Sequence, residues 1–287
     1  MRRLLAALLC LGLAGAAFAQ SMSLGGAVTQ TSRGQSANAW THPKNFHQWF
    51  WDLCDASSVK QEITGASATT PSVNGDVVGT VANVGVVGSK GGYWVAPTTG
   101  QRPILRLSGG RCRLEFDGTD DVLVWSGAAV TLTGGYRAMF VAAERTGATN
   151  YNRFFSVAQS GTNDNGNAQN FFVGLDDGTK RVMHERSSGF YGQNGSGIAP
   201  KQMIEAYHFA DNSRAGLYID RAEVAFGTPG GTGSLPTSGA NEIRLGAGRQ
   251  SGGNADYCKC DIYSGGLREG DLSSTEITAT RAWLARQ

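Results

Sequence analysis

The stretch RCRLEFDGTDDVLVW, residues 111–125, contains the pattern from which the fold class is predicted. Its first part, Arg111–Phe116, alternates polar and apolar residues, which is typical of a β-strand that buries one face. Asp117-Gly118 follows as a turn signature, and Val122–Trp125 is a second apolar run. The stretch therefore predicts two strands separated by a turn.

Similar short runs recur along the chain at fairly regular spacing, separated by loops rich in Gly, Asn, Ser and Thr. The further segments expected as strands are 50–54, 76–81, 137–144, 154–158, 171–175, 181–185, 203–209, 215–219, 242–246 and 256–263. A helix is expected only at the end, where Ser273–Glu276 matches a capping box and 277–284 can form two turns. Many short strands with one terminal helix predict an all-β sandwich or barrel, because each half-apolar sheet must cover its face.

The first nineteen residues have the features of a signal peptide. Arg2 and Arg3 precede an uncharged apolar segment, 4–17, and Ala17-Phe18-Ala19 provides the small residues that signal peptidase accepts. Residues 20–45 are polar and aperiodic, which predicts an arm or linker before a domain at 46–287. We therefore expect a secreted or periplasmic protein. No later segment approaches the roughly 18 apolar residues of a membrane span, so no membrane association is expected after leader removal.

The charge balance and the glycine content exclude two classes of protein. The chain has 25 basic and 23 acidic residues, and two of the basic ones, Arg2 and Arg3, belong to the leader. Nucleic-acid binders carry a basic surplus, so no nucleic-acid partner is expected. Glycine accounts for 41 of 287 residues without a three-residue period, which excludes collagen and predicts many tight turns. The sequence gives no indication of the oligomeric state.

Four cysteines remain outside the leader: Cys54, Cys112, Cys258 and Cys260. An even number in an exported chain predicts disulfides, and three connectivities are open. Zinc is the competing interpretation. Cys258-x-Cys260 lacks the two-residue gap of the usual zinc knuckle, and no histidine lies close by in sequence.

Several stretches of the chain resemble the LamG-like, concanavalin A-like jelly-roll superfamily. They are Leu114–Leu123, Ala215–Asp220 followed by Glu223-Val224, and Asp261–Leu267 with the terminal helix. The resemblance covers residues 50–285 and implies a two-sheet antiparallel jelly-roll sandwich with a short C-terminal helix. Such domains are found in phage tail or virion proteins and in bacterial exported proteins. Arg221 departs from the pattern, because the family's hairpin usually has glycine there.

The resemblance also implies a disulfide pairing. In jelly rolls of this family the first and last strands pair in one sheet, which would bring Cys54 near Cys258 or Cys260. We therefore expect Cys54 and Cys112 each to bond one of Cys258 and Cys260. A bond between Cys258 and Cys260 is not expected, since Cα atoms two residues apart on a strand stand about 6.5 to 7 Å apart, near the disulfide limit.

No catalytic residue is assigned. The superfamily includes glycosidases and polysaccharide lyases, but the Glu-x-Asp-x-(x)-Glu phrase of the jelly-roll glucanases does not occur. Asp120-Asp121 and Asp176-Asp177 lie in glycine-containing turns, where aspartate usually binds its own backbone. Tyr207-His208 offers the residue types of a lyase, but adjacent residues in a strand point to opposite faces.

The expected function is therefore that of an exported, non-enzymatic LamG-like domain that binds a glycan or another cell-surface ligand. One alternative is a structural or adhesive component of a phage particle, hence virion-associated, or of a cell surface. A glycoside hydrolase or polysaccharide lyase is the third possibility.

Sugar sites combine aromatic rings with polar partners for the hydroxyls. The candidate glycan ligands are Tyr93, Trp94, Tyr151, Asn152, Arg153, Phe190, Tyr191, Gln193 and Asn194. Calcium is the one cofactor for which the sequence offers a candidate site, at Asn163, Asp164 and Asn165, although these lack the distant bidentate glutamate of an EF-hand.

Overall fold

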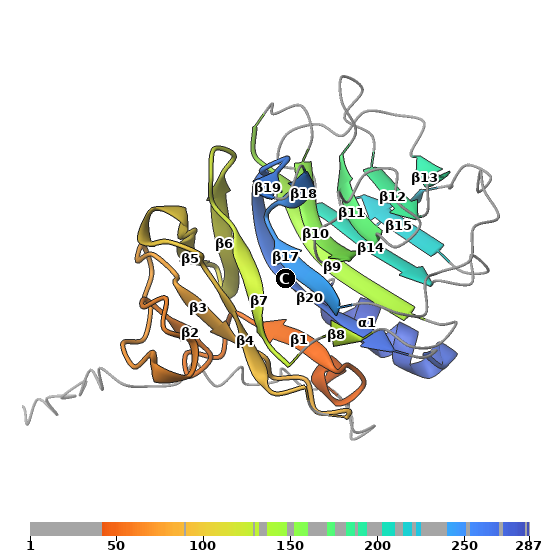
Figure 1. The fold of residues 1–287 in the computed structure, drawn as a ribbon. Coiled ribbons are helices and arrows are strands. Elements are labelled where there is room, and N and C mark those ends of the chain that lie inside the picture. The colour runs from red at the N-terminus through yellow and green to blue at the C-terminus, as the bar shows by residue number, and fades with distance from the viewer. Residues whose placement is uncertain are drawn as a thin grey trace, which may run out of the picture. The chain divides into compact units, whose positions relative to one another are not determined.

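The computed structural model describes residues 42–88, 90–128, 130–131, 137–147, 152–159, 171–175, 182–186, 189–193, 203–209, 215–219, 222–224, 240–250, 253–269, 272–284 and 286. Two large antiparallel β-sheets and one helix, α1 (Ser274–Leu284), dominate this part of the chain (Figure 1). The predicted all-β sandwich with a short C-terminal helix is confirmed. The predicted leader at 1–19 and the arm as far as residue 41 lie outside the described residues.

The first sheet, sheet A, has eight strands in the order β16-β15-β14-β9-β20-β6-β5, with β1 also paired to β20. Its strands are β1 (Trp49–Asp52), β5 (Ile104–Ser108), β6 (Arg111–Asp117), β9 (Arg137–Arg145), β14 (Met203–Phe209), β15 (Ala215–Ile219), β16 (Ala222–Val224) and β20 (Lys259–Glu269).

The second sheet, sheet B, has ten strands in the order β13-β12-β11-β10-β17-β7-β4-β3-β2, with β8 paired to β17. Its strands are β2 (Val59–Lys60), β3 (Thr80–Ala82), β4 (Gly92–Val95), β7 (Leu123–Gly127), β8 (Val130–Thr131), β10 (Asn152–Gln159), β11 (Phe171–Leu175), β12 (Val182–Arg186), β13 (Gly189–Gln193) and β17 (Ala240–Leu245). The smaller elements are a hairpin of β18 (Gly248–Gln250) and β19 (Gly253–Ala255), and the 3-10 turns η1 (Pro43–Asn45), η2 (Gly65–Ser67) and η3 (Thr99–Gln101).

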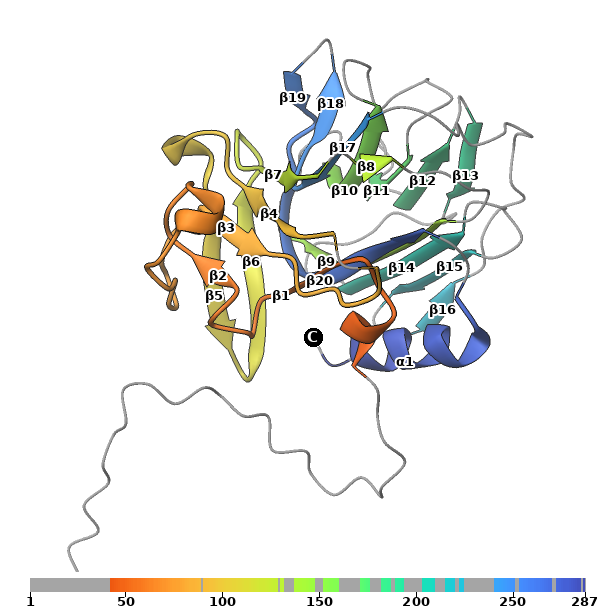
Figure 2. The ribbon, with the colours of Figure 1, turned by 60° about the horizontal axis from the view of Figure 1, so that its bottom comes forward.

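Sheet A lies between sheet B and α1 (Figure 2). Strand β6 shows how the sequence produces this arrangement. Its residues alternate between partly exposed and buried, so that Cys112, Leu114 and Phe116 enter the core between the sheets. The alternation expected for Arg111–Phe116 is therefore confirmed.

Tryptophans form much of the core between the sheets. Trp51 and Trp94 meet edge to face at 5.5 Å between ring centroids, and Trp94 meets Trp125 at 5.1 Å. Trp49 joins the group through Trp125 at 6.4 Å. Such pairs each contribute about 0.5 to 1.5 kcal/mol beyond the area they bury. The rings come from β1, β4 and β7, so this cluster fixes the two sheets against each other.

Helix α1 begins with the predicted capping box. The backbone N–H of Ser273 donates to Glu276 Oε2 at 2.7 Å, and the N–H of Glu276 donates back to Ser273 Oγ at 3.3 Å. Trp283 then packs on Phe50 at 5.1 Å, which holds the helix on the outer face of sheet A. Within the described residues, none of the helices is both long and apolar enough to cross a membrane.

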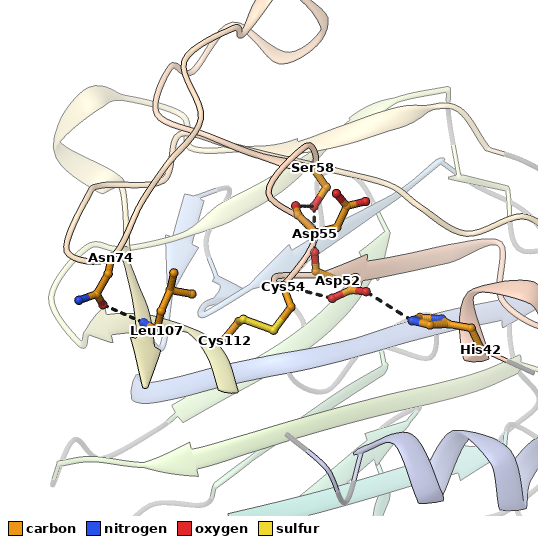
Figure 3. The surroundings of a disulfide bond; sticks show 8 residues. All are labelled: His42, Asp52, Cys54, Asp55, Ser58, Asn74, Leu107 and Cys112. Carbon is orange, nitrogen blue, oxygen red and sulfur yellow. Dashed lines mark hydrogen bonds and ion pairs between the residues drawn. A yellow bond between two sulfur atoms is a disulfide. The ribbon is translucent and has the colours of Figure 1, made fainter. Parts of the chain in front are cut away.

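All four cysteines form disulfides as expected, but the predicted pairing is wrong. The bonds are Cys54–Cys112, drawn in Figure 3, and Cys258–Cys260. Strand β1 does pair with β20, yet Asp52 already lies opposite Ser264, and β6 pairs with the neighbouring part of β20 on the same side. The chain leaving β1 therefore runs into β6, where Cys54 meets Cys112.

The Cys258–Cys260 bond forms, against expectation, because of the local geometry before β20. Cys258 precedes β20, so the spacing of an extended strand does not apply to this pair. The two Cα atoms are 5.3 Å apart, within the usual disulfide range.

Candidate functional site

A pocket of about 570 Å³ opens beside β4 and β7, within the size range of small-molecule sites. One wall is the turn at residues 63–66, which includes the start of η2. The rest is formed by Gly91, Gly92, Tyr93 and Val95 at β4 and by Ser126-Gly127 of β7. We refer to it as the Tyr93 pocket.

The strand alternation of β4 separates the two aromatic residues predicted to bind a glycan together. Trp94 is fully buried in the core, where it contacts Trp51 and Trp125. Tyr93 and Val95 point to the opposite face, as neighbours of a buried strand residue must. Only Tyr93 of this predicted pair lines the pocket.

The turn that forms the pocket wall is held against Tyr93. Gly65 has φ +57°, and a side-chain carbon placed on it would lie 3.7 Å from the Tyr93 ring. The Thr80 hydroxyl accepts from the Gly65 N–H at 3.3 Å and donates to the Glu62 carbonyl at 2.6 Å. Gly79 permits this close approach, because a side-chain carbon there would come within 2.4 Å of the Glu62 carbonyl. The wall is thus preformed, which lowers the ordering cost of binding.

Three of the residues that line the pocket carry a hydroxyl group. Thr64, Tyr93 and Ser126 line it, and none of their hydroxyls has a hydrogen-bond partner among the described residues. None of the lining residues that the structure describes carries a charged side chain. The pocket therefore offers one aromatic ring, aliphatic surface from Ile63 and Val95, and hydroxyls available to a ligand.

Tyr93 was predicted from the sequence, whereas the residues opposite it in the pocket were not. Residues 63–66 lie in a Gly/Ser/Thr/Val stretch that was expected to be mostly loop, and nothing in their pattern indicates contact with β4. Ser126 was missed because the predicted strand ended at Trp125, one residue earlier. Strand register is the signal that places Ser126 at the pocket, because Ser126 pairs with Tyr93 across β7 and β4.

The other predicted glycan ligands do not join the pocket. Arg153 is fully buried, and its Nη2 lies 3.4 Å from Asp256 Oδ2, so it serves an internal ion pair. The remaining predicted ligands fall outside the described side chains. They are Tyr151, Asn152 in β10, Phe190, Tyr191 and Gln193 in β13, and Asn194.

The predicted calcium ligands Asn163, Asp164 and Asn165 lie outside the described residues. Within the described part, Asp117, Asp120 and Asp121 bring their carboxylate oxygens within 4.8 Å of one another. Two of them bind the backbone of their own turn.

In that turn, Asp117 Oδ1 accepts from the Thr119 N–H at 2.7 Å, and Asp121 Oδ2 accepts from the Asp117 N–H at 2.9 Å. Burial raises the pKa of Asp121 to about 6. These contacts hold the connection between β6 and β7, which is the structural role expected of the aspartates there.

A row of acidic groups crosses the outer face of sheet A. Glu115, Asp261 and Glu144 occupy facing positions on β6, β20 and β9. Each has a protein partner: the pairs are Arg106–Glu115 and Arg113–Asp261, both at 2.7 Å, and Tyr263 donating to Glu144 at 2.9 Å. Burial raises the pKa of Asp261 to about 6. These contacts join four strands, and none of the residues in the row lines the Tyr93 pocket.

A histidine–aspartate pair near the start of the domain is structural (Figure 3). His42 Nε2 lies 3.4 Å from Asp52 Oδ2, and His42 Nδ1 accepts from the Lys44 N–H at 3.1 Å, so both ring nitrogens are engaged. The nearby Ser58 hydroxyl donates to the carbonyls of Asp52 and Asp55, both at 2.8 Å. These residues do not form a nucleophilic triad, because Ser58 is not bonded to the imidazole. Tyr207-His208 lies in β14, whose side chains are outside those described.

No protein-family model matches the sequence, and the search of curated proteins found no match. Among solved structures, the chain is similar to Trypanosoma rangeli sialidase in complex with sialic acid, at 11% identity and a TM-score of 0.48. That match covers 81% of this chain and 32% of the sialidase, so the chain spans about a third of that protein.

A second similar structure is a variant of NanB sialidase from Streptococcus pneumoniae, at 16% identity and a TM-score of 0.37, covering 51% of this chain and 24% of NanB. A third is domain 4 of AbnA, a GH43 extracellular arabinanase from Geobacillus stearothermophilus, in complex with arabinotriose. It is 15% identical with a TM-score of 0.41, covering 82% of this chain and 98% of that domain.

These comparisons require a correction to the predicted function. The similar structures are named as sialidases and as part of an arabinanase, which contradicts the prediction of a non-enzymatic LamG-like protein. That prediction is not carried further. The two-sheet β-sandwich stands, while no match to the LamG-like family was found.

Proposed function

We propose that the chain is a carbohydrate-active protein that holds a sugar in the Tyr93 pocket. The observation that carries the proposal is the combination of groups in this pocket: an aromatic ring, aliphatic surface, and three hydroxyl residues whose hydroxyls have no hydrogen-bond partner among the described residues. A sugar ring presents an apolar face and a rim of hydroxyls. An aromatic side chain matches the first, and protein hydroxyls match the second.

Glycine makes part of the pocket accessible to a ligand. A side-chain carbon at Gly91 would meet no other atom within 4 Å, so the position borders open space. A sugar hydroxyl can therefore approach the backbone there more closely than a larger residue would allow. On the opposite side, the turn at Gly65 faces the Tyr93 ring, since a side-chain carbon on Gly65 would lie 3.7 Å from it.

The proposal includes export from the cytoplasm. It is supported by the signal-peptide features of residues 1–19 and by the two disulfides, since such bonds persist in oxidising compartments. Sequencing the N-terminus of the protein recovered from the periplasm or medium tests this part. A chain that begins at Gln20 is the expected result, and retention of Met1 in that fraction would contradict it.

The binding site is tested by two variants that act in different ways. Tyr93→Ala removes the ring, and Gly91→Val fills the open space without the strain of a positive φ. Each should weaken glycan binding about tenfold or more, equivalent to about 1.4 kcal/mol or more. Gly100→Ala is the matched control, because Gly100 also has room for a side-chain carbon, at 4.0 Å from Thr98, but lies outside the pocket.

The measurement is a glycan array on the folded protein, followed by titration of the best ligands. The same panel is assayed for release of reducing ends, since a substrate held in the pocket would lose turnover in the same two variants. Binding or turnover that survives both substitutions would show that the pocket is not the site. A blank over a broad panel in both assays would overturn the proposed function itself.

A further inference from the structure

We infer that the sugar held in the Tyr93 pocket is uncharged: a neutral pentose or hexose unit rather than a uronic or sialic acid. This inference rests on the proposed function and adds the class of ligand. It follows from what lines the pocket and from where the neighbouring charges are directed.

Acidic sugars carry a carboxylate that a protein must match. Proteins recognise such groups with arginine or lysine, most strongly through paired charge-assisted hydrogen bonds. Among the described residues that line the Tyr93 pocket there is no arginine, lysine or histidine. A carboxylate that entered would lose hydration without gaining a cationic partner, which is unfavourable. Sugar hydroxyls, by contrast, can pair with Thr64, Tyr93 and Ser126.

The two charged residues that border the lining in sequence are turned to other partners. Lys90 precedes Gly91, but its Nζ lies 4.0 Å from Glu269 Oε2 and 5.7 Å from the centre of the Trp49 ring. The Lys90 charge is therefore directed toward β1 and the end of β20. Glu62 precedes Ile63, and its Oε1 accepts from the Thr70 N–H at 3.0 Å.

The inference is tested with matched ligands that differ by a carboxylate. Galactose and galacturonate oligomers form one pair, and lactose and sialyllactose form another. The neutral member of each pair should bind at least about tenfold more tightly, and its Kd should change less than about twofold between about 50 and about 500 mM salt. Titration calorimetry on the wild-type protein and on Tyr93→Ala provides the measurement.

A charge introduced at the pocket provides a second readout. Ser126 is exposed on β7 and lines the pocket, so Ser126→Lys places a cation there, while Ser126→Gln supplies a polar side chain without charge. Only the lysine variant should bind the acidic members more tightly than wild type, by about fivefold, and this gain should disappear at high salt.

The possible results distinguish the inference of a neutral ligand from the proposed function itself. If the acidic members bind the wild-type protein more tightly, and Tyr93→Ala abolishes that binding, the inference of a neutral ligand is wrong while the proposed function stands. If neither these pairs nor any other glycan of the broad panel binds or is processed, the proposed function fails with it.

Discussion

Removing the Cys54–Cys112 disulfide should destabilise the domain far more than removing Cys258–Cys260. The first bond joins residues 58 positions apart, and the second joins residues two positions apart. In the chain-entropy model, the stabilisation grows with the logarithm of the closed loop. It amounts to about 4 kcal/mol for the long loop and about 1 kcal/mol for the short one at 25 °C.

Two double variants isolate these contributions from side-chain packing. Cys258→Ala with Cys260→Ala retains only the long-range bond, and Cys54→Ala with Cys112→Ala retains only the short one. Each is unfolded in guanidinium with and without reductant, and the two free energies of unfolding are subtracted. The subtraction matters because Cys258 and Cys260 are fully buried, so replacing them also removes packing contacts.

We expect reduction to cost about 4 kcal/mol in the variant that keeps Cys54–Cys112, and about 1 kcal/mol in the other. The long-range bond ties the end of β1 to β6, two strands that lie along the same side of β20. Loss of this bond gives the N-terminal part of the domain more conformational freedom in the unfolded state. Equal losses in the two variants, or a larger loss for the short loop, would refute this account.

Two further predictions concern buried positions. Burial lowers the pKa of His47 to about 4 and favours the neutral ring, which bonds the Pro43 carbonyl through Nδ1 at 2.8 Å. The stability that His47 contributes is therefore present above about pH 6.5 and lost as the pH falls to about 4. We expect the free energy of unfolding to fall by about 3 kcal/mol over this pH range, and this fall to disappear in His47→Gln. Denaturation at a series of pH values provides the measurement, and an identical pH profile for the two proteins would contradict the prediction. Gly246→Ala should lower the free energy of unfolding by about 3 kcal/mol. Gly246 has φ +81°, and the new side-chain carbon would lie 2.2 Å from the buried Phe116 ring. Gly109→Ala, with φ +61° and open space, should cost only about 1 kcal/mol in the same denaturation assay, and equal costs would show that the Phe116 contact does not matter.

Much of the β-structure was predictable, because alternation with a period of two directly encodes which face of a strand is buried. The strands at 171–175, 203–209 and 215–219 match their predicted limits. The last strand was expected at 256–263 but runs over Lys259–Glu269. Its start was misplaced because Asp256 has φ +51°, which no extended strand adopts.

The end of β20 was missed because the predicted strand stopped at Tyr263, before Gly265-Gly266. In the sheet these glycines lie between β1 and β9. A side-chain carbon on Gly265 would come within 2.2 Å of the Phe140 carbonyl, and one on Gly266 within 2.7 Å of the Trp49 carbonyl. The glycines are therefore required by close backbone packing in a central strand. Sequence pattern alone does not distinguish this use of glycine from a turn.

The glycines of the Tyr93 pocket also differ in whether close packing requires them. Side-chain carbons on Gly92 and Gly127 would each come within 2.6 Å of the Trp125 indole, which belongs to the core. Glycine at these two positions is thus required by the packing of Trp125, whatever the pocket binds. Gly91 has no such neighbour. Of the three, only Gly91 can be changed without disturbing the core, and it is therefore the position at which substitution reports on the ligand rather than on the fold.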